Sequence, residues 1–204
     1  MKVKETTELY TTKKQRFTYR DYLNLPDDGQ RYEIIHGDLV MTPAPVPLHQ
    51  MVSGNIFNLL STHIKTNQLG FVLYAPCDVV LDELNVVQPD ILFITRERAE
   101  IITEKNIQGA PDLIIEIISP TTAYYDLVSK KDVYQQFGVR EYWLVDPIRR
   151  SVQVLVLTDE KWVTDQEVIG DGSVASRLLP EFCISLSAIF PQLPESAQNA
   201  SNEE

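Results

Sequence analysis

The sequence of 204 residues predicts a single α/β (or α+β) domain in which helices flank a mixed central β-sheet. Short apolar runs of strand length alternate with two longer segments in which apolar residues recur at helical spacing. One of these runs, 113–118, is apolar at every position except Glu116, which is typical of a strand buried on both faces. Hairpins are expected as additions near both ends of the domain.

Each element follows from a local signal. Thr18 and Asp21 fit a capping box that opens a short helix. Two strands, 31–35 and 38–41, are expected around a turn at His36 and Gly37, and three prolines make 42–47 an extended loop. The remaining expected elements are a helix at 48–66, strands at 71–75, 79–81 and 89–94 with a loop around 83–85, a short helix and loop at 96–106, the Glu116 strand, a helix at 125–137, a strand at 141–145, a hairpin of 152–156 with 161–163, and a terminal module at 174–189.

Composition and charge limit the classes of function. We expect a weakly ordered N-terminus at 1–15, one domain at 16–192 and a disordered tail at 193–204. No apolar run is long enough to span a bilayer and no signal peptide is recognisable, which predicts a cytoplasmic protein without a membrane partner. The net charge of −11 argues against a broad polyanion-binding surface.

Glu116 is the most informative residue, because a chain selected only for folding would carry Val or Leu there. An ionised carboxylate in such a strand costs several kcal/mol unless it is paired or binds a metal. The residues that meet Glu116 should therefore reveal the function.

Asp90 and Lys130 are the first candidate partners. Asp90 follows a proline at the start of an apolar strand; the alternative is an ordinary turn or cap residue. Lys130 shares a helical face with Asp126 and Tyr134, on the helix that directly follows the Glu116 strand. The alternative for Lys130 is a solvated pair with Asp126 on a surface helix.

Glu33 and His49 complete the candidates. Glu33 interrupts an apolar strand much as Glu116 does, whereas His49, near the start of the long helix, could equally be structural or exposed. If three acids converge, one lysine cannot neutralise them. An all-oxygen set of ligands then suits Mg²⁺ or Mn²⁺. The alternative is a buried ion pair between Glu116 and Lys130 that only holds helix to strand.

These residues resemble the PD-(D/E)XK nuclease superfamily and, more closely, the Uma2-like family with the restriction-endonuclease fold. The resemblance runs from about 17 to 190. It rests on the order Asp126, Lys130, Tyr134 and on the segments 31–40 (RYEIIHGDLV), 87–91 (VQPDI), 109–120 (GAPDLIIEIISP) and 138–147 (GVREYWLVDP).

The resemblance implies a restriction-endonuclease-like core and a role for each candidate. Asp90 and Glu116 would be metal ligands, with the Ile117 carbonyl as a further oxygen, and Lys130 would be the superfamily lysine. Glu33 matches an additional acidic position and His49 a position where the family often has histidine. The chain departs from the superfamily pattern at Ile118, where the usual lysine would stand. Activity therefore depends on Lys130 reaching the site.

The function implied is a Mg²⁺- or Mn²⁺-dependent endonuclease that hydrolyses phosphodiester bonds of DNA, by analogy as a homodimer. The alternative is a non-catalytic nucleic-acid-binding or protein-binding accessory protein that retains the nuclease fold, which the acidic charge favours. Nucleic acid would be held by local basic residues such as Lys13, Lys14, Arg16, Arg96 and Arg98.

Overall fold

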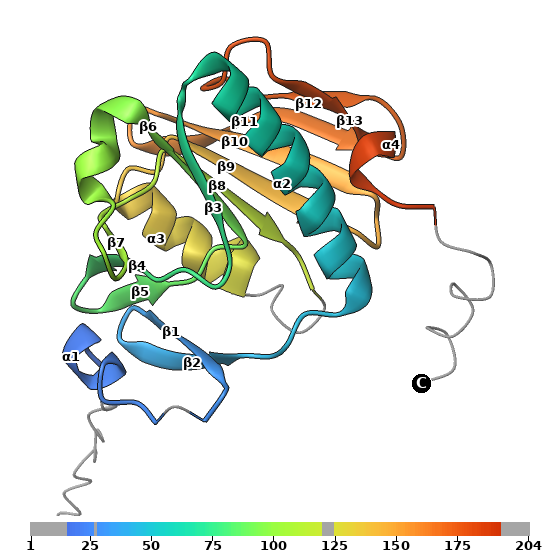
Figure 1. Cartoon of the computed structure of the whole chain (residues 1–204). Helices are drawn as coiled ribbons and strands as arrows, with labels where there is room; N and C mark the ends of the chain where they lie inside the picture. The colour runs from blue at the N-terminus through green and yellow to red at the C-terminus, as the bar shows by residue number, and fades with distance from the viewer. Residues whose placement is uncertain (1–15, 27, 120–124, 193–204) are drawn as a thin grey trace, which may run out of the picture.

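The computed structural model describes residues 16–26, 28–119 and 125–192, with the backbone alone at 125 and 126 (Figure 1). The segments expected to be weakly ordered, 1–15 and 193–204, lie outside the described residues. The first half contains α1 (Tyr19–Tyr22), β1 (Arg31–Ile35), β2 (Asp38–Thr42), α2 (Pro47–Asn67), β3 (Gly70–Tyr74), β4 (Val79–Asp82), β5 (Asn85–Val87), β6 (Ile91–Thr95) and the 3₁₀ helix η1 (Arg96–Ile101). The second half contains β7 (Ile107–Gln108), β8 (Leu113–Ile117), the π-helix η2 (Tyr125–Lys130), α3 (Lys131–Gln136), β9 (Glu141–Asp146), β10 (Ser151–Thr158), β11 (Lys161–Ile169), β12 (Ser173–Ala175), β13 (Cys183–Ser185) and α4 (Leu186–Ile189).

A six-stranded mixed sheet forms the centre of the fold, in the order β11-β10-β9-β8-β6-β3. The pair β8 and β9 is parallel, and the other neighbouring strands are antiparallel. All five residues of β8 are buried, because the strand lies inside the sheet between β6 and β9. The predicted mixed sheet and the fully buried strand that carries Glu116 are therefore both confirmed.

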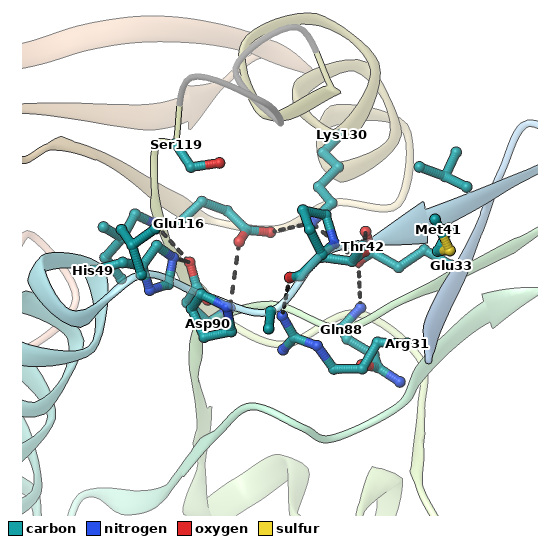
Figure 2. Close-up of a pocket in the computed structure, with 16 residues that line it drawn as sticks. Arg31, Glu33, Met41, Thr42, His49, Gln88, Asp90, Glu116, Ser119 and Lys130 are labelled. Carbon is teal, nitrogen blue, oxygen red and sulfur yellow. Dashed lines mark hydrogen bonds and ion pairs between the residues drawn. The ribbon is translucent and has the colours of Figure 1, made fainter. Parts of the chain in front are cut away.

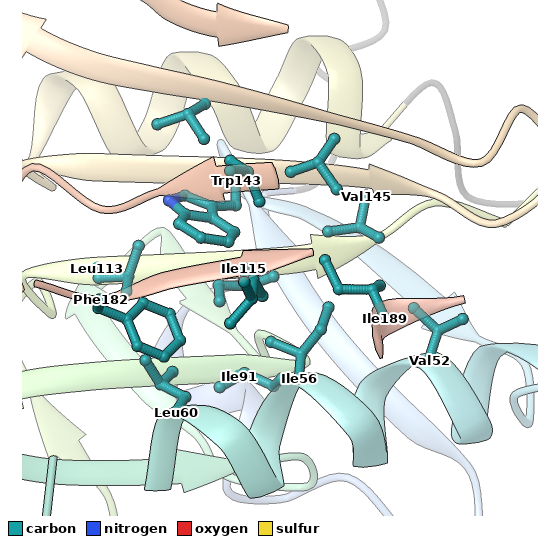
Figure 3. Packing of buried hydrophobic residues seen from close by; sticks show 14 of the residues in the cluster. Val52, Ile56, Leu60, Ile91, Leu113, Ile115, Trp143, Val145, Phe182 and Ile189 are labelled. Atoms are coloured by element: carbon teal, nitrogen blue, oxygen red, sulfur yellow. The ribbon is translucent and has the colours of Figure 1, made fainter. Parts of the chain in front are cut away.

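Helices cover both faces of this sheet (Figure 1). The residues of α2 pack with Ile115, Ile117 and Trp143 in the largest apolar cluster, which Figure 3 shows from close by. On the other face, α3 packs against Ile114. Because successive side chains of a strand alternate, Glu116 points to the same face as Ile114. None of the helices in the described ranges is long and apolar enough to cross a membrane.

A second sheet, in the order β2-β1-β5-β4-β7, brings Glu33 of β1 to the core. The loop expected around 83–85 is wrong in part, because β5 begins at Asn85. The Asn85 side chain donates a hydrogen bond to Asp82 Oδ1 (2.8 Å) and accepts one from the His36 backbone N–H (2.9 Å). These bonds stabilise the tight turn between β4 and β5. The next residue, Val86, pairs with Ile34 of β1.

The helix expected at 125–137 is divided in the structure. It begins as the π-helix η2 and continues as α3, so that Lys130 lies where the two meet. A π-turn contains one residue more than an α-turn, which rotates every preceding side chain relative to a regular helix. Spacing that assumes a regular helix therefore fails before Lys130 and holds from Lys130 to Tyr134.

Candidate active site

A pocket of about 280 Å³ lies at the carboxyl end of β8, between the β1–β2 hairpin and the start of α2 (Figure 2). One wall is mostly apolar and is formed by the segment 40–46. The opposite wall is polar. It contains the residues that the sequence nominates for catalysis or metal binding, namely Glu33, His49, Asp90, Glu116, Ile117 and Lys130, together with Arg31, Gln88 and Ser119.

The side chain of Glu116 is only 3% exposed, and residues in the described part of the chain donate at least three hydrogen bonds to it. Lys130 Nζ and the Tyr134 hydroxyl donate to its Oε1 atom, at 3.1 and 2.7 Å. The backbone N–H of Asp90 donates to Oε2 at 3.3 Å. The partners that a buried carboxylate requires are therefore supplied by the next helix and by the start of the neighbouring strand.

Lys130 links two buried carboxylates. Its Nζ atom lies 3.0 Å from Glu33 Oε1 and 3.1 Å from Glu116 Oε1, and its side chain is 6% exposed. The alternative of a solvated lysine is therefore wrong, and the side chain of Asp126 lies outside the described part of the chain. Three carboxylates line the pocket with Lys130 and Arg31, so negative charge remains in excess there.

Asp90 connects β8 to the first turn of α2. Its Oδ2 atom accepts a hydrogen bond from the Ile117 backbone N–H (2.8 Å) and lies 3.1 Å from His49 Nε2. The other ring nitrogen of His49 is buried and has no hydrogen-bond partner among the described atoms, so Asp90 is what orients the ring. Asp90 is therefore more than a turn residue, since it tethers the end of one central strand.

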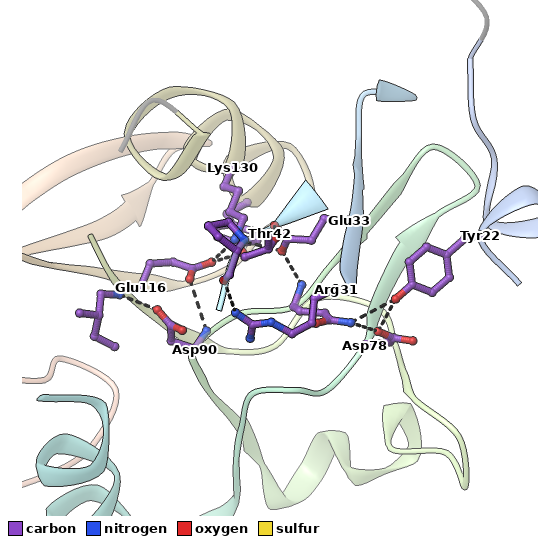
Figure 4. A network of polar contacts seen from close by, with 12 residues as sticks. Tyr22, Arg31, Glu33, Thr42, Asp78, Asp90, Glu116 and Lys130 are labelled. Carbon is purple, nitrogen blue, oxygen red and sulfur yellow. Dashed lines mark hydrogen bonds and ion pairs between the residues drawn. The ribbon is translucent and has the colours of Figure 1, made fainter. Parts of the chain in front are cut away.

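Glu33 reaches the site through Lys130 rather than through Asp90. Its Oε1 atom also accepts a hydrogen bond from the Gln88 backbone N–H at 2.6 Å, and its Oε2 atom accepts one from the Thr42 hydroxyl at 3.3 Å. Figure 4 shows how this network continues outward: the Gln88 amide nitrogen donates to Asp78 (2.8 Å), which also accepts from Tyr22 (2.8 Å). The position of Lys130 is thereby fixed from the second sheet.

Tyr134 is a residue of the site that the sequence signals only through its spacing from Lys130. Its ring is fully buried, and it stacks edge-to-face on Tyr142 at 5.2 Å. Burial, and next the negative charge of Glu116, raise the pKa of Tyr134 well above its ordinary value. The hydroxyl therefore keeps its proton and acts as a fixed donor to Glu116.

The oxygens at the pocket suit a small divalent cation. Asp90 Oδ1 accepts no hydrogen bond from the described residues, and the side chain is 14% exposed where it lines the pocket. Two carboxylates supply only part of a coordination shell. In the described ranges no three His, Cys, Asp or Glu side chains are grouped as a metal centre. Carboxylate and carbonyl oxygens are the ligands that Mg²⁺ or Mn²⁺ prefers, whereas zinc prefers His and Cys.

None of the basic residues expected to hold nucleic acid that the structure describes, Arg16, Arg96 and Arg98, lines the pocket. Arg98 has a structural role, because it donates hydrogen bonds to the buried carboxylate of Asp112 (2.9 Å) and to the Ala110 carbonyl (2.8 Å). Lys13 and Lys14 lie outside the described residues. Arg31, which the sequence does not single out, lines the pocket instead.

Comparison with known proteins agrees with this fold. Residues 19–187 match the sequence model of a family described as "Uma2: Putative restriction endonuclease". A crystal structure from Anabaena variabilis ATCC 29413, titled as a "putative nuclease belonging to DUF820", superposes with a TM-score of 0.70 at 20% identity, covering 85% of this chain and 97% of that one. No functionally curated protein matches the sequence. Because the family match extends over most of the chain, this protein belongs to the Uma2 family.

Proposed function

We propose that this protein is a metal-dependent endonuclease that hydrolyses phosphodiester bonds of DNA. The observation that carries the proposal is the meeting of Asp90, Glu116 and Lys130 in one pocket, although Asp90 precedes β6 whereas the other two stand on β8 and η2. Two acids that can hold a cation and a lysine that can stabilise negative charge form a set suited to phosphodiester hydrolysis. The family description supports the same class of reaction.

Asp90 and Glu116 would hold a Mg²⁺ or Mn²⁺ ion, with the Ile117 carbonyl as a third oxygen ligand. Such an ion supplies Lewis acidity, which makes water more acidic and neutralises charge on the phosphate oxygens. His49 would fix the Asp90 carboxylate through the contact between its Nε2 atom and Oδ2. Tyr134 would do the same for Glu116, because its hydroxyl donates to Oε1.

Lys130 would stabilise the charge that develops on the phosphate. Its ammonium group is almost completely buried, so little water screens its field. Its contacts with Glu33 and Glu116 fix the position of this group before substrate arrives. In this account Glu33 positions Lys130 and does not contact the metal.

The test is cleavage of two circular substrates, a supercoiled plasmid and a single-stranded circle, in the presence of Mg²⁺ or Mn²⁺. Wild type should open either circle, whereas Asp90→Asn and Lys130→Met should be inactive. Lys131→Met is the matched control, because Lys131 stands one residue further and does not line the pocket. Cleavage that survives both Asp90→Asn and Lys130→Met, or a wild type that cleaves neither circle, contradicts the proposal and favours the non-catalytic accessory protein.

A further inference from the structure

A second cavity adjoins the pocket and shares a wall with it. Its volume is about 510 Å³, and the residues that line both spaces are Arg31, Thr42, Ala44, Pro45 and Asp90. The rest of its lining comes from the residues before β1, from the first two turns of α2 and from the end of β3 and the residues after it, as Gly29, Gln30, Gln50, Ser53, Tyr74, Ala75 and Pro76. The two spaces therefore meet at Asp90.

Tyr74 presents an aromatic ring at this second cavity. Its side chain is 59% exposed, and Phe57 supports it edge-to-face at a centroid distance of 4.5 Å. The next residue, Ala75, donates a backbone hydrogen bond to the Asp90 carbonyl at 3.0 Å. An exposed ring held next to a metal-ligand position offers a face on which a nucleobase can stack.

The second cavity is lined by fewer charged side chains than the first. Among the residues that line it, Asp90 and Arg31 are the charged ones, whereas Glu33, Glu116 and Lys130 line only the first space. Arg31 donates one hydrogen bond to the Pro43 carbonyl at 3.2 Å. The guanidinium group has five N–H donors in a planar fork, so it can bind a phosphate while it keeps this bond.

We propose that the second cavity is a subsite for a nucleotide adjacent to the cleaved phosphate, with Tyr74 stacked on its base and Arg31 on its phosphate. The inference rests on the proposed nuclease function and adds the class of substrate, which is an unpaired strand. The sizes of the two spaces lie near the lower part of the range of pockets for small molecules, roughly 300–1,000 Å³.

The burial of the site favours an unpaired strand over a continuous duplex as substrate. Glu116 and Lys130 are 3% and 6% exposed at the back of the first pocket, whose other wall is the segment 40–46. In a duplex each base is already stacked and paired, so Tyr74 could take one only after it had been flipped out, at a cost of a few kcal/mol. An unpaired strand needs no such step. The net charge of −11 also disfavours an extended duplex-binding surface.

The test is binding of a fluorescent ten-residue oligothymidine, measured by anisotropy without divalent cations, against a duplex of equal length. Wild type should bind the single strand more tightly than the duplex. Tyr74→Ala should weaken single-strand binding by about tenfold, the loss of one base stack. Tyr74→Phe should bind like wild type. Phe71→Ala is the control, since Phe71 is an exposed aromatic residue of the same strand that lies outside both cavities.

Arg31 gives an independent readout. Arg31→Ala should reduce the dependence of log affinity on log salt concentration by about 0.7, the value for one phosphate contact on a single strand. Arg31→Lys should restore this dependence. Equal binding by Tyr74→Ala and wild type, or tighter binding of the duplex, would overturn the subsite. A protein that binds through Tyr74 but cleaves neither circle would keep the subsite and lose the nuclease function.

Discussion

Lys130 Nζ lies 3.1 Å from Glu116 Oε1, although the lysine stands on the helix after the strand and not on the strand itself. The position at which the superfamily pattern has its lysine is occupied by Ile118, which packs against the apolar cluster under α3. The helix that follows β8 therefore places a lysine side chain next to the end of that strand. The junction of η2 and α3 falls at that lysine.

Lys130→Met should change metal binding and cleavage in opposite directions. The substitution removes a positive charge from a pocket that contains three carboxylates, so Mn²⁺ should bind at least as tightly as it binds to wild type. Cleavage should be lost, because the charge on the phosphate is no longer stabilised. Calorimetric titration and the cleavage assay on one preparation check both effects. Weaker Mn²⁺ binding by this variant would count against the assigned division of roles.

The contact between Lys130 and Glu33 should appear as a coupling energy in unfolding experiments. Lys130→Met alone should reduce the free energy of unfolding by about 3–5 kcal/mol, since it leaves buried carboxylates without their cation. Adding Glu33→Gln should recover part of that loss, because one of those charges is removed. Urea unfolding of the four proteins measures the coupling. Additive effects would show that the two side chains do not interact.

Tyr134→Phe should weaken metal binding without removing any proposed ligand. The variant keeps the ring in the core but deletes the hydroxyl that donates to Glu116 at 2.7 Å. Loss of such an orienting bond typically lowers metal affinity or activity by about 10–100-fold. The raised pKa of Tyr134 keeps its proton in place at ordinary pH, so the decrease should be the same at pH 7 and pH 9. Unchanged Mn²⁺ affinity would show that Glu116 needs no help from Tyr134.

Asp112 should make the stability depend on pH in acid. Burial alone would raise its pKa, but hydrogen bonds from the Thr95 N–H and from Arg98 outweigh it and lower the pKa below its ordinary value. Because the pKa of Asp112 is lower in the folded state, the ionised carboxylate stabilises the protein at pH values above its unfolded pKa of about 3.9. This stabilisation is lost as the pH falls through the pKa of the folded state. Wild type should therefore lose unfolding free energy from about pH 5 downward.

Asp112→Asn should be less stable than wild type at pH 7 by about 1.5–3 kcal/mol, the usual contribution of hydrogen bonds to a charged group. The difference should narrow as the pH approaches 3. Urea unfolding at each pH measures it, with the exposed substitution Glu100→Gln as the control. If the difference in unfolding free energy between the two proteins stays constant with pH, the ionised Asp112 carboxylate does not stabilise the folded state.

The central residues of the site could be predicted because the two glutamates violate their local pattern. Glu116 and Glu33 interrupt apolar strands, and Lys130 follows the Glu116 strand at a distance that a short connection can close. Such violations persist in a folded protein only where partners compensate them. The central sheet could be predicted in the same way, because the residues of β8 other than Glu116 are apolar on both faces of the strand.

Other parts depend on contacts that no local pattern encodes. In the second sheet, the pairing of β5 with β1 depends on the Asn85 side chain, which hydrogen-bonds both to Asp82 and to the His36 backbone N–H. The wall at 40–46 and the exposed ring of Tyr74 come together only because β3 pairs with β6 and leads Ala75 to the Asp90 carbonyl. The expected homodimer stays a prediction.

Titration of Mn²⁺ into wild type and Glu116→Gln by calorimetry tests the central claim most directly. Glutamine preserves the size of the side chain and can still accept the hydrogen bond from the Tyr134 hydroxyl, but it removes the charge and replaces the oxygen that accepts from the Asp90 N–H. We predict that wild type binds one Mn²⁺ ion per chain and that Glu116→Gln binds at least tenfold more weakly, about 1.4 kcal/mol. Equal binding by the two proteins, or no binding by wild type, would contradict the assignment of Glu116 as a metal ligand.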